Sequence, residues 1–237
     1  ETKTIRGLGL APGGAGTEGP QIAISAALAE ARVSKAAISR AVATGYGRNI
    51  AEEQDETLSE LSCHAFGAHE LFPNVRTVVD IGGQDAKILK VDKNGRLDGF
   101  VMNDKCAAGT GRFLENTARV LDVRIEDIAA FAELSEHRID ISSTCAVFAE
   151  SEIVSQLACG ASRNDMFSAV FRSVAARTAG LAKRLGVVPE ATMTGGVAKN
   201  DGVRRALEEE LGVRISVSPL AQYAGALGAA VYALRGA

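Results

Sequence analysis

A glycine pair between two apolar segments most constrains how this chain of 237 residues can fold. Residues 77–81 and 86–92 are rich in β-branched and apolar side chains and predict two strands. Residues 82–85, Gly-Gly-Gln-Asp, predict the turn that joins them. Asn94-Gly95 is a strong hairpin signal, and residues 97–102 predict a third strand. We therefore expect three consecutive antiparallel strands with a Gly-Gly turn at the first corner.

The rest of the chain alternates between helical and extended segments. Residues 1–21 combine six glycines with two prolines and have no regular apolar period, so we expect an irregular segment there. An Ala-rich stretch follows, in which Ser34 can cap a short turn before a strand at 41–43. The pattern further predicts helices over 110–121, 167–185, 201–211 and after Pro219, and strands at 138–142, 191–194 and 214–217. The fold class is mixed α/β.

Charge and hydropathy exclude several classes of function. The chain has 26 Lys and Arg against 29 Asp and Glu, a net charge of −3, which argues against a nucleic-acid binder with a basic face. No apolar run approaches the roughly 18 residues that span a bilayer, and the N-terminus has no charged stretch followed by an apolar signal core. We expect a cytoplasmic protein that binds neither membrane nor nucleic acid.

The turn at 82–85 has the chemistry of a phosphate-binding loop. Gly82 and Gly83 lack the Cβ that would hold backbone amides away from phosphate oxygens. Asp80 and Asp85 flank the turn, where they can hold Mg²⁺ through water or orient an attacking water. The glycine pair alone does not exclude an ordinary hairpin with a bulge, and the GxxxxGK[ST] pattern of a P-loop is absent.

A second glycine pair, Gly195-Gly196, lies between a predicted strand and a predicted helix. Glycines there allow a flat ring to lie against the backbone, and the helix start offers unpaired amides. A common strand-to-helix turn is an equally good explanation.

The four cysteines contain no CxxC pair, which disfavours a zinc ribbon. Cys106 comes just before a predicted helix, where Lys105 and the helix dipole favour the thiolate. Ser143 or Thr144 can cap a second helix, which Cys145 opens and which runs to about residue 159. An iron–sulfur cluster generally takes four thiolates, so two ligands in one chain suggest a cluster completed by a second chain. Two buried thiols are the alternative.

The remaining cysteines and two of the histidines are expected to have structural roles. Cys63 and Cys159 are predicted to be packed thiols. His64 and His69 are predicted to share one face of a helix.

Five segments together carry a family resemblance. They are ATGYGR at 43–48, DIGGQDAK at 80–87, NDKCAAGTGRFLE at 103–115, STCAVFAESE at 143–152 and TGGVAKN at 194–200. In this order and spacing they closely resemble the activator ATPases of 2-hydroxyacyl-CoA dehydratases, a family that includes the ATPase subunits of benzoyl-CoA reductase. The resemblance covers about residues 22–237.

The resemblance implies the ATPase fold shared by actin, sugar kinases and heat-shock chaperones, with ATP between two ribonuclease H-like subdomains. It also implies a dimer, of two copies or of sister subunits, that shares one 4Fe-4S cluster. ATP hydrolysis would drive single low-potential electrons into a dehydratase or reductase component. Ferredoxin or flavodoxin would supply these electrons.

The resemblance also assigns roles to individual residues. It makes Cys106 and Cys145 the cluster ligands, and Gln84 and Asp85 the catalytic residues of the second phosphate loop. The residues implied to contact ATP, ADP or Mg²⁺ are Asp80, Gly82, Gly83, Gln84, Lys87, Gly109, Gly111, Glu115, Gly195, Gly196, Val197 and Asn200.

The chain departs from the family pattern at its start, because residues 1–21 contain no phosphate-1 loop of the DxGSxxxK kind. We therefore expect residues 1–72 to form an incomplete first subdomain. Residues 73–218 are expected to form the second subdomain, and residues 219–237 a helix that returns to the first. Two alternatives stay open: a sugar or N-acylhexosamine kinase of the same fold, and a cluster-carrying subunit that does not hydrolyse ATP.

Overall fold

A five-stranded mixed sheet forms the centre of the molecule. The computed structural model describes residues 3–14, 16–51, 54–104, 106–141 and 146–235. The strands are ordered β5 (Leu97–Asn103), β4 (Ala86–Val91), β3 (Thr77–Ile81), β6 (Ala191–Thr194) and β7 (Ile215–Val217). Strands β3, β4 and β5 are antiparallel, whereas β6 and β7 run parallel to β3. The expected three antiparallel strands are confirmed.

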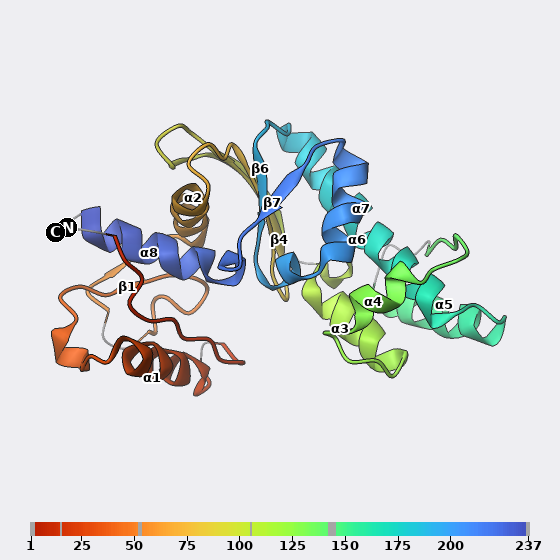
Figure 1. Cartoon of the computed structure of the whole chain (residues 1–237), viewed down its shortest axis with the longest axis horizontal. Helices are drawn as coiled ribbons and strands as arrows, with labels where there is room; N and C mark the ends of the chain where they lie inside the picture. The colour runs from red at the N-terminus through yellow and green to blue at the C-terminus, as the bar shows by residue number, and fades with distance from the viewer. Residues whose placement is uncertain (1–2, 15, 52–53, 105, 142–145, 236–237) are drawn as a thin grey trace.

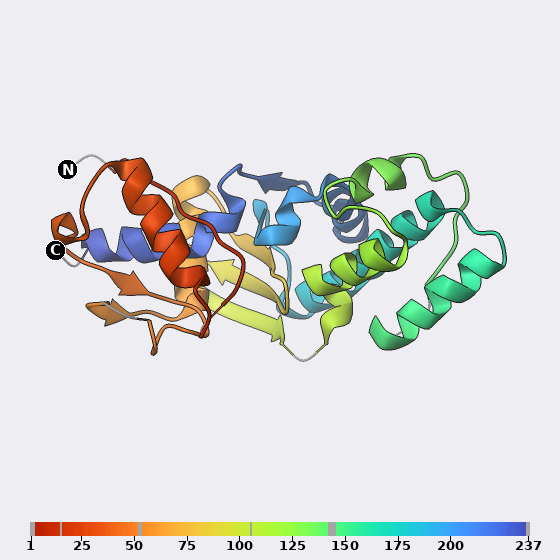
Figure 2. The same ribbon diagram turned by 90° about the horizontal axis from the view of Figure 1, so that it is seen from below.

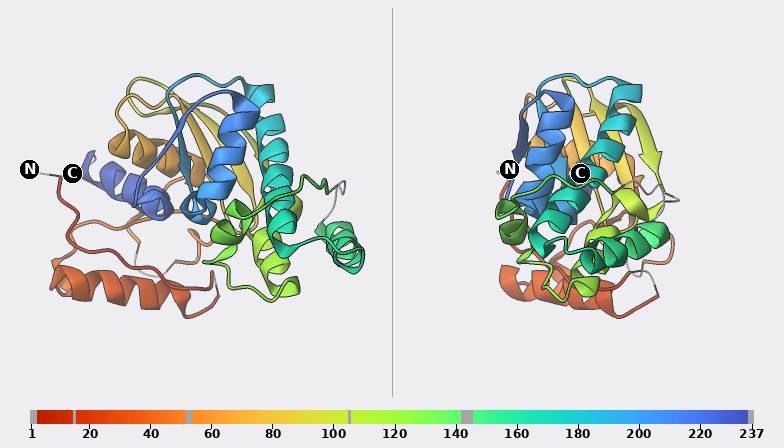
Figure 3. Two further views of the ribbon diagram at one scale, coloured as in Figure 1. Left: turned by 45° about the vertical axis from the view of Figure 1, so that its right-hand side comes forward. Right: turned by 90° about the vertical axis from the view of Figure 1, so that its right-hand side faces the viewer.

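Helices cover both faces of this sheet (Figures 1 and 3). Helices α6 (Arg163–Leu185) and α7 (Asp201–Leu211) lie on one face. On the other face α2 (Glu60–Leu71) packs against the sheet, and α8 (Ala224–Arg235) packs against α2. Gly186 and Gly212 end α6 and α7, as the sequence predicts.

The alternation of side chains along β3 explains these two layers. Val79 and Ile81 point into the large core with α6 and α7, whereas Val78 joins a smaller core with Ala65 and Ala68 of α2. Asp80 therefore lies on the α2 side of the sheet, at the end of the strand where the polar residues gather.

Smaller elements lie at the two ends of the molecule. Figure 2 shows α1 (Gly19–Ala31) at one end and α3 (Gly111–Val120), α4 (Ile128–Glu133) and α5 (Ala146–Ala158) toward the other. Strands β1 (Val42–Ala43) and β2 (Glu56–Thr57) form a separate parallel pair. Short 3₁₀ turns are η1 (Lys35–Ala37), η2 (Ala107–Gly109), η3 (Gly196–Lys199) and η4 (Ala221–Tyr223). Residues 3–14 have no helix or strand.

Helices α2 and α8 cross at glycines. A Cβ on Gly67 would lie 1.9 Å from the carbonyl oxygen of Ala224, and one on Gly228 would lie 1.7 Å from that of Cys63. Only hydrogen fits at these positions. Helix α8 also contacts β1, and α2 contacts the five-stranded sheet. The predicted subdomain boundaries, after residues 72 and 218, stay a prediction.

Three local predictions are wrong. Residues 138–141 form no strand, because the carbonyl of Ile139 accepts a hydrogen bond from the Arg172 side chain and not from a neighbouring strand. Cys159 is exposed, because α5 ends at Ala158 at the surface. His64 and His69 are five residues apart and so lie about 140° apart around α2.

None of the helices in the described part of the chain combines the length and the apolar composition that a membrane span needs.

Candidate functional site

The Gly-Gly turn lies at the junction of β3 and β4. The amide of Gly82 donates a hydrogen bond to the carbonyl of Asp85 at 3.0 Å, which closes the turn. Gly83 and Gln84 are exposed, and no atom lies within 4 Å of a Cβ built on Gly83. The backbone of the turn is therefore open to an approaching anion, as the phosphate-loop hypothesis requires.

The first turn of α3 is bonded to this turn. The amide of Gly111 donates to the carbonyl of Gly82, and the amide of Arg112 donates to that of Gly83, both at 2.9 Å. A Cβ on Gly111 would lie 3.1 Å from the Gly82 oxygen and 3.3 Å from a methyl carbon of Val197. Gly111 thus lies between the turn and the second glycine segment.

The second glycine pair packs against β3. Gly195 has a φ of +83°, and a Cβ there would lie 2.3 Å from the carbonyl oxygen of Ile81. Its amide donates to the carbonyl of Ala221 at 3.2 Å, which links this segment to η4. A Cβ on Gly196 would make only an ordinary van der Waals contact, with Nε2 of Gln222 at 3.7 Å. Three segments far apart in the sequence, around Gly82, Gly111 and Gly195, therefore meet at one place.

A buried ion cluster lies directly behind the turn. The Nζ atom of Lys87 lies 2.7 Å from Oδ1 of Asp85, 2.8 Å from Oε1 of Glu60 and 3.3 Å from Oδ2 of Asp80. Burial by itself would lower the pKa of Lys87, but these carboxylates outweigh it and raise that pKa. Lys87 is therefore a charged residue held by protein carboxylates, which fix its ammonium behind the turn.

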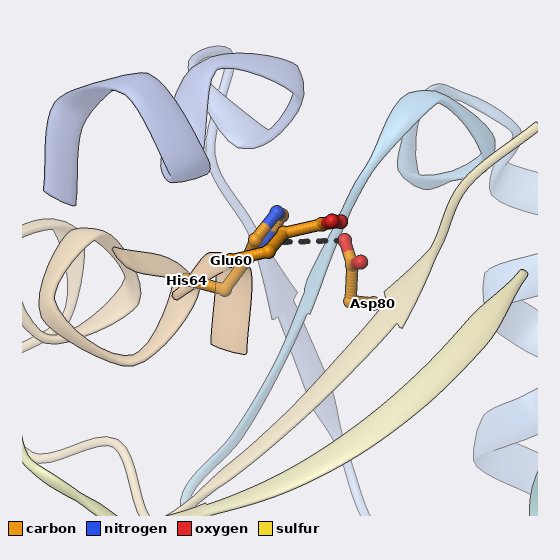
Figure 4. A group of neighbouring side chains, drawn as sticks. All are labelled: Glu60, His64 and Asp80. Atoms are coloured by element: carbon orange, nitrogen blue, oxygen red, sulfur yellow. Dashed lines mark ion pairs between the residues drawn. The ribbon is translucent and has the colours of Figure 1, made fainter. Parts of the chain in front are cut away.

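His64 joins this cluster from α2. Its Nδ1 atom lies 3.3 Å from Oδ1 of Asp80 (Figure 4). The same atom lies 3.4 Å from the hydroxyl of Thr194. The Thr194 hydroxyl donates to the same Asp80 oxygen at 2.8 Å. Burial by itself would raise the pKa of Asp80, but His64, Lys87 and Thr194 lower it. Asp80 is therefore a buried carboxylate with each oxygen in contact with polar groups.

Glu60, His64 and Asp80 also have the donor types of a metal site. Their ligand atoms lie within 4.8 Å of one another. However, the ammonium of Lys87 contacts both carboxylates and already supplies the positive charge there. We therefore describe this group as an ion cluster, and Mg²⁺ binding by Asp80 and Asp85 stays a prediction.

Four residues of this site were not predicted from the sequence: Glu60, His64, Thr194 and Tyr46. The hydroxyl of Tyr46 donates a hydrogen bond to Oδ2 of Asp85 at 3.2 Å. The spacing of Glu60 and His64 could have linked these two residues, because residues four apart lie on one face of a helix. Tyr46 belongs to the ATGYGR segment, but nothing local connects it to Asp85, 39 residues away.

The remaining predicted nucleotide contacts have varied surroundings. The side chain of Asn200 caps α7 by accepting from the amide of Val203 at 3.0 Å. Glu115 is exposed and pairs with Arg112 at 3.6 Å. Gly109 is buried, and a Cβ on it would contact Arg177. Their roles toward a nucleotide stay predictions.

Cys106 is half-buried and precedes η2, not α3. The α-helix begins five residues later at Gly111, so the predicted position at an α-helix N-terminus is wrong. The Asn103 side chain accepts from the Cys106 amide at 3.2 Å and donates to its carbonyl at 3.0 Å, which fixes this backbone. Cys145 and Lys105 lie outside the described residues, and α5 is described from Ala146.

Cys63 and Cys106 differ in how well their thiols suit a shared cluster. Cys63 is completely buried, and burial raises the pKa of its thiol, so it is a poor ligand. Cys106 is only half-buried on a fixed backbone, which suits a ligand that must also reach a group shared with a second chain.

Comparison with known proteins identifies the family of the chain. The sequence matches the BadF/BadG/BcrA/BcrD ATPase family over residues 14–233. The (R)-2-hydroxyglutaryl-CoA dehydratase activating ATPase of Acidaminococcus fermentans is 55% identical over 223 residues, which cover 94% of this chain and 85% of that relative.

Two solved structures share the fold over nearly the whole chain. The crystal structure of (R)-2-hydroxyglutaryl-CoA dehydratase component A from Acidaminococcus fermentans has a TM-score of 0.91 at 55% identity, and the match covers 94% of this chain and 86% of that one. The activator of 2-hydroxyisocaproyl-CoA dehydratase from Clostridium difficile, with bound ADPNP, has a TM-score of 0.91 at 45% identity, with 94% and 83% covered. The chain has the actin-like ATPase fold, which confirms the predicted fold class.

Proposed function

Because the chain belongs to the BadF/BadG/BcrA/BcrD ATPase family, we propose that it couples ATP hydrolysis to the delivery of single low-potential electrons. The acceptor is a partner of the 2-hydroxyacyl-CoA dehydratase or benzoyl-CoA reductase type. One observation carries the proposal: the glycine segments around Gly82, Gly111 and Gly195 meet beside the carboxylate of Asp85. The activator of 2-hydroxyisocaproyl-CoA dehydratase was solved with bound ADPNP, which supports nucleotide binding by this chain.

In this proposal the backbone binds the nucleotide. The exposed backbone at Gly83 and Gln84 binds phosphate oxygens, while the amide of Gly82 closes the turn, and Gly196 and Val197 lie against the adenosine. Asp85 orients the attacking water, with Gln84 beside it. Asp80 and Asp85 are the residues that would hold Mg²⁺ through water, while the ammonium of Lys87 bridges the two carboxylates.

The electron-transfer part of the proposal concerns Cys106 and Cys145. These two residues from each of two chains, either identical copies or sister subunits, would hold one 4Fe-4S cluster per dimer, which supplies one-electron chemistry when bound. Ferredoxin or flavodoxin would provide the electrons, in the cytoplasm.

Coupling between the two sites would use the chain's own backbone. The bonds from Gly111 and Arg112 to the Gly-Gly turn transmit a movement of that turn to α3. Cys106 lies one short 3₁₀ turn before this helix, so its position follows the helix start.

Iron content tests this proposal most sharply. Protein purified without oxygen should contain about four irons and four sulfides per dimer. Cys106→Ser should lose them and the dimer seen by native mass spectrometry. Cys159→Ser is the matched control, because Cys159 is exposed beyond the end of α5, and it should keep both.

The same preparation separates the alternatives. Iron-free wild-type protein that is unchanged by Cys106→Ser contradicts the proposal, and phosphate transfer to a sugar would then identify a kinase. An iron-loaded protein that releases no phosphate from ATP would identify a subunit that carries the cluster without hydrolysis.

A further inference from the structure

The carboxylate of Asp85 is held from two sides. Its Oδ1 atom pairs with the buried ammonium of Lys87 at 2.7 Å. Its Oδ2 atom accepts a hydrogen bond from the hydroxyl of Tyr46 at 3.2 Å. Tyr46 is 72% exposed, so the ring is not there to fill a core. The hydroxyl contact is the feature of this side chain that needs an explanation.

The turn that carries Tyr46 is built locally. Gly45 has a φ of +84°, a left-handed conformation that disfavours side chains with a Cβ. Its carbonyl accepts from the amide of Arg48 at 3.3 Å and from the Arg48 guanidinium at 3.0 Å. The turn follows β1, which pairs with β2 and contacts α8. Tyr46 therefore belongs to the small sheet, whereas Asp85 belongs to the five-stranded sheet.

We propose that Tyr46 is a positioning residue for Asp85 in ATP hydrolysis, which fixes the second carboxylate oxygen from the small sheet while Lys87 fixes the first. This inference rests on the proposed function. A phenol suits the task because it is a neutral donor, so it orients the carboxylate without adding a second positive charge beside it. Partial desolvation and the nearby Asp85 charge raise the pKa of Tyr46 further above neutrality, so the phenol remains a hydrogen-bond donor at neutral pH.

The proposal predicts a specific kinetic effect. Tyr46→Phe removes the hydroxyl alone, and kcat for ATP hydrolysis should fall about threefold to tenfold, the range expected for one lost hydrogen bond, while KM for ATP stays within about twofold. Tyr232→Phe is the matched control, because its hydroxyl donates to Glu56 at 2.7 Å away from the turn. That variant should keep both constants.

Several outcomes would overturn it. An unchanged kcat in Tyr46→Phe means that the hydroxyl does not position Asp85. A raised KM with unchanged kcat means that Tyr46 binds the nucleotide directly. An equal fall of kcat in Tyr232→Phe means that the loss of activity does not depend on the contact between Tyr46 and Asp85. Wild-type protein that neither binds nor hydrolyses ATP would overturn the proposed function as well, and this is measured before any variant is compared.

A spectroscopic measurement tests the location of Tyr46 without using activity. The chain contains no Trp, so Tyr46→Trp introduces a single fluorophore at an exposed position. Its emission should change on addition of ATP and Mg²⁺, with the same midpoint that calorimetry gives for ATP binding. Phe100→Trp, at an exposed position on β5, should not respond. Unchanged emission from Tyr46→Trp while calorimetry detects binding would contradict the proposal.

Discussion

The backbone amide of Gly111 donates a hydrogen bond to the carbonyl oxygen of Gly82 at 2.9 Å. This contact joins the start of α3, a few residues after Cys106, to the turn between β3 and β4. It is the direct physical connection between the proposed nucleotide site and the proposed cluster ligand.

Gly111→Ala should weaken nucleotide binding. Its Cβ would lie 3.1 Å from the Gly82 oxygen and 3.3 Å from Cα of Gly83, so the turn must shift. We expect a loss of about 1–2 kcal/mol in stability and a Kd for ATP raised about tenfold. Gly180→Ala in α6 is the control, because no atom lies within 4 Å of its Cβ, and it should stabilise by up to about 1 kcal/mol. Thermal unfolding and calorimetry measure both, and an unaffected Kd in Gly111→Ala would contradict the assignment.

Two neighbouring glycines should behave differently. Gly195→Ala combines a φ of +83° with a Cβ 2.3 Å from the carbonyl oxygen of Ile81. We expect it to destabilise the fold by about 3 kcal/mol. The nearest atom to a Cβ on Gly196 is Nε2 of Gln222, at 3.7 Å, so Gly196→Ala should stay within about 0.5 kcal/mol of wild type. If Gly196 lies against the adenosine, its variant should nevertheless bind ATP more weakly, and unchanged binding would exclude that role.

Lys87→Met should destabilise the fold strongly. It leaves Glu60, Asp80 and Asp85 close together without their shared cation, at an expected cost of about 3–5 kcal/mol. Adding Asp80→Asn should recover part of this loss, because one of the repelling charges is removed. Lys90→Met, on the same strand, should cost about 0.5 kcal/mol or less. Chemical denaturation measures the free energy of unfolding of all these variants. If the double variant loses the sum of what Lys87→Met and Asp80→Asn lose separately, the two residues do not interact and the cluster is contradicted.

Asp165 should stabilise the fold in a pH-dependent way. Hydrogen bonds from the amide of His137, the hydroxyls of Ser162 and Ser135 and the amide of Glu136 hold the pKa of Asp165 well below its usual range. Its contribution is therefore complete above the unfolded pKa of about 4 and is lost as the pH falls toward the folded value.

Asp165→Asn should cost about 2–3 kcal/mol at neutral pH, and the difference from wild type should shrink below about pH 4. Asp140→Asn is the control, since the Asp140 side chain is 79% exposed with only distant ion pairs. Denaturation at a series of pH values checks this, and a difference independent of pH would contradict the assignment.

Local patterns in the sequence determined much of the fold. The β-branched run at 77–81, the Gly-Gly turn and Asn94-Gly95 each act over a few residues, so the hairpins could be predicted. Gly186 and Gly212 ended helices as expected for the same reason. The strand at 138–142 failed because a short extended segment needs a partner, and Arg172 supplies a side-chain contact in its place.

The same distinction between local patterns and distant contacts holds for the site. By itself the sequence located two glycine pairs, Gly82-Gly83 and Gly195-Gly196, as candidate nucleotide-binding turns, because a glycine pair is a local feature of the chain. It could not show that Lys87 is enclosed by three carboxylates, or that His64 reaches Asp80 from α2 and Tyr46 reaches Asp85 from the small sheet. Those contacts join residues on separate elements, and only the packing of α2, β1 and the five-stranded sheet decides which of them meet.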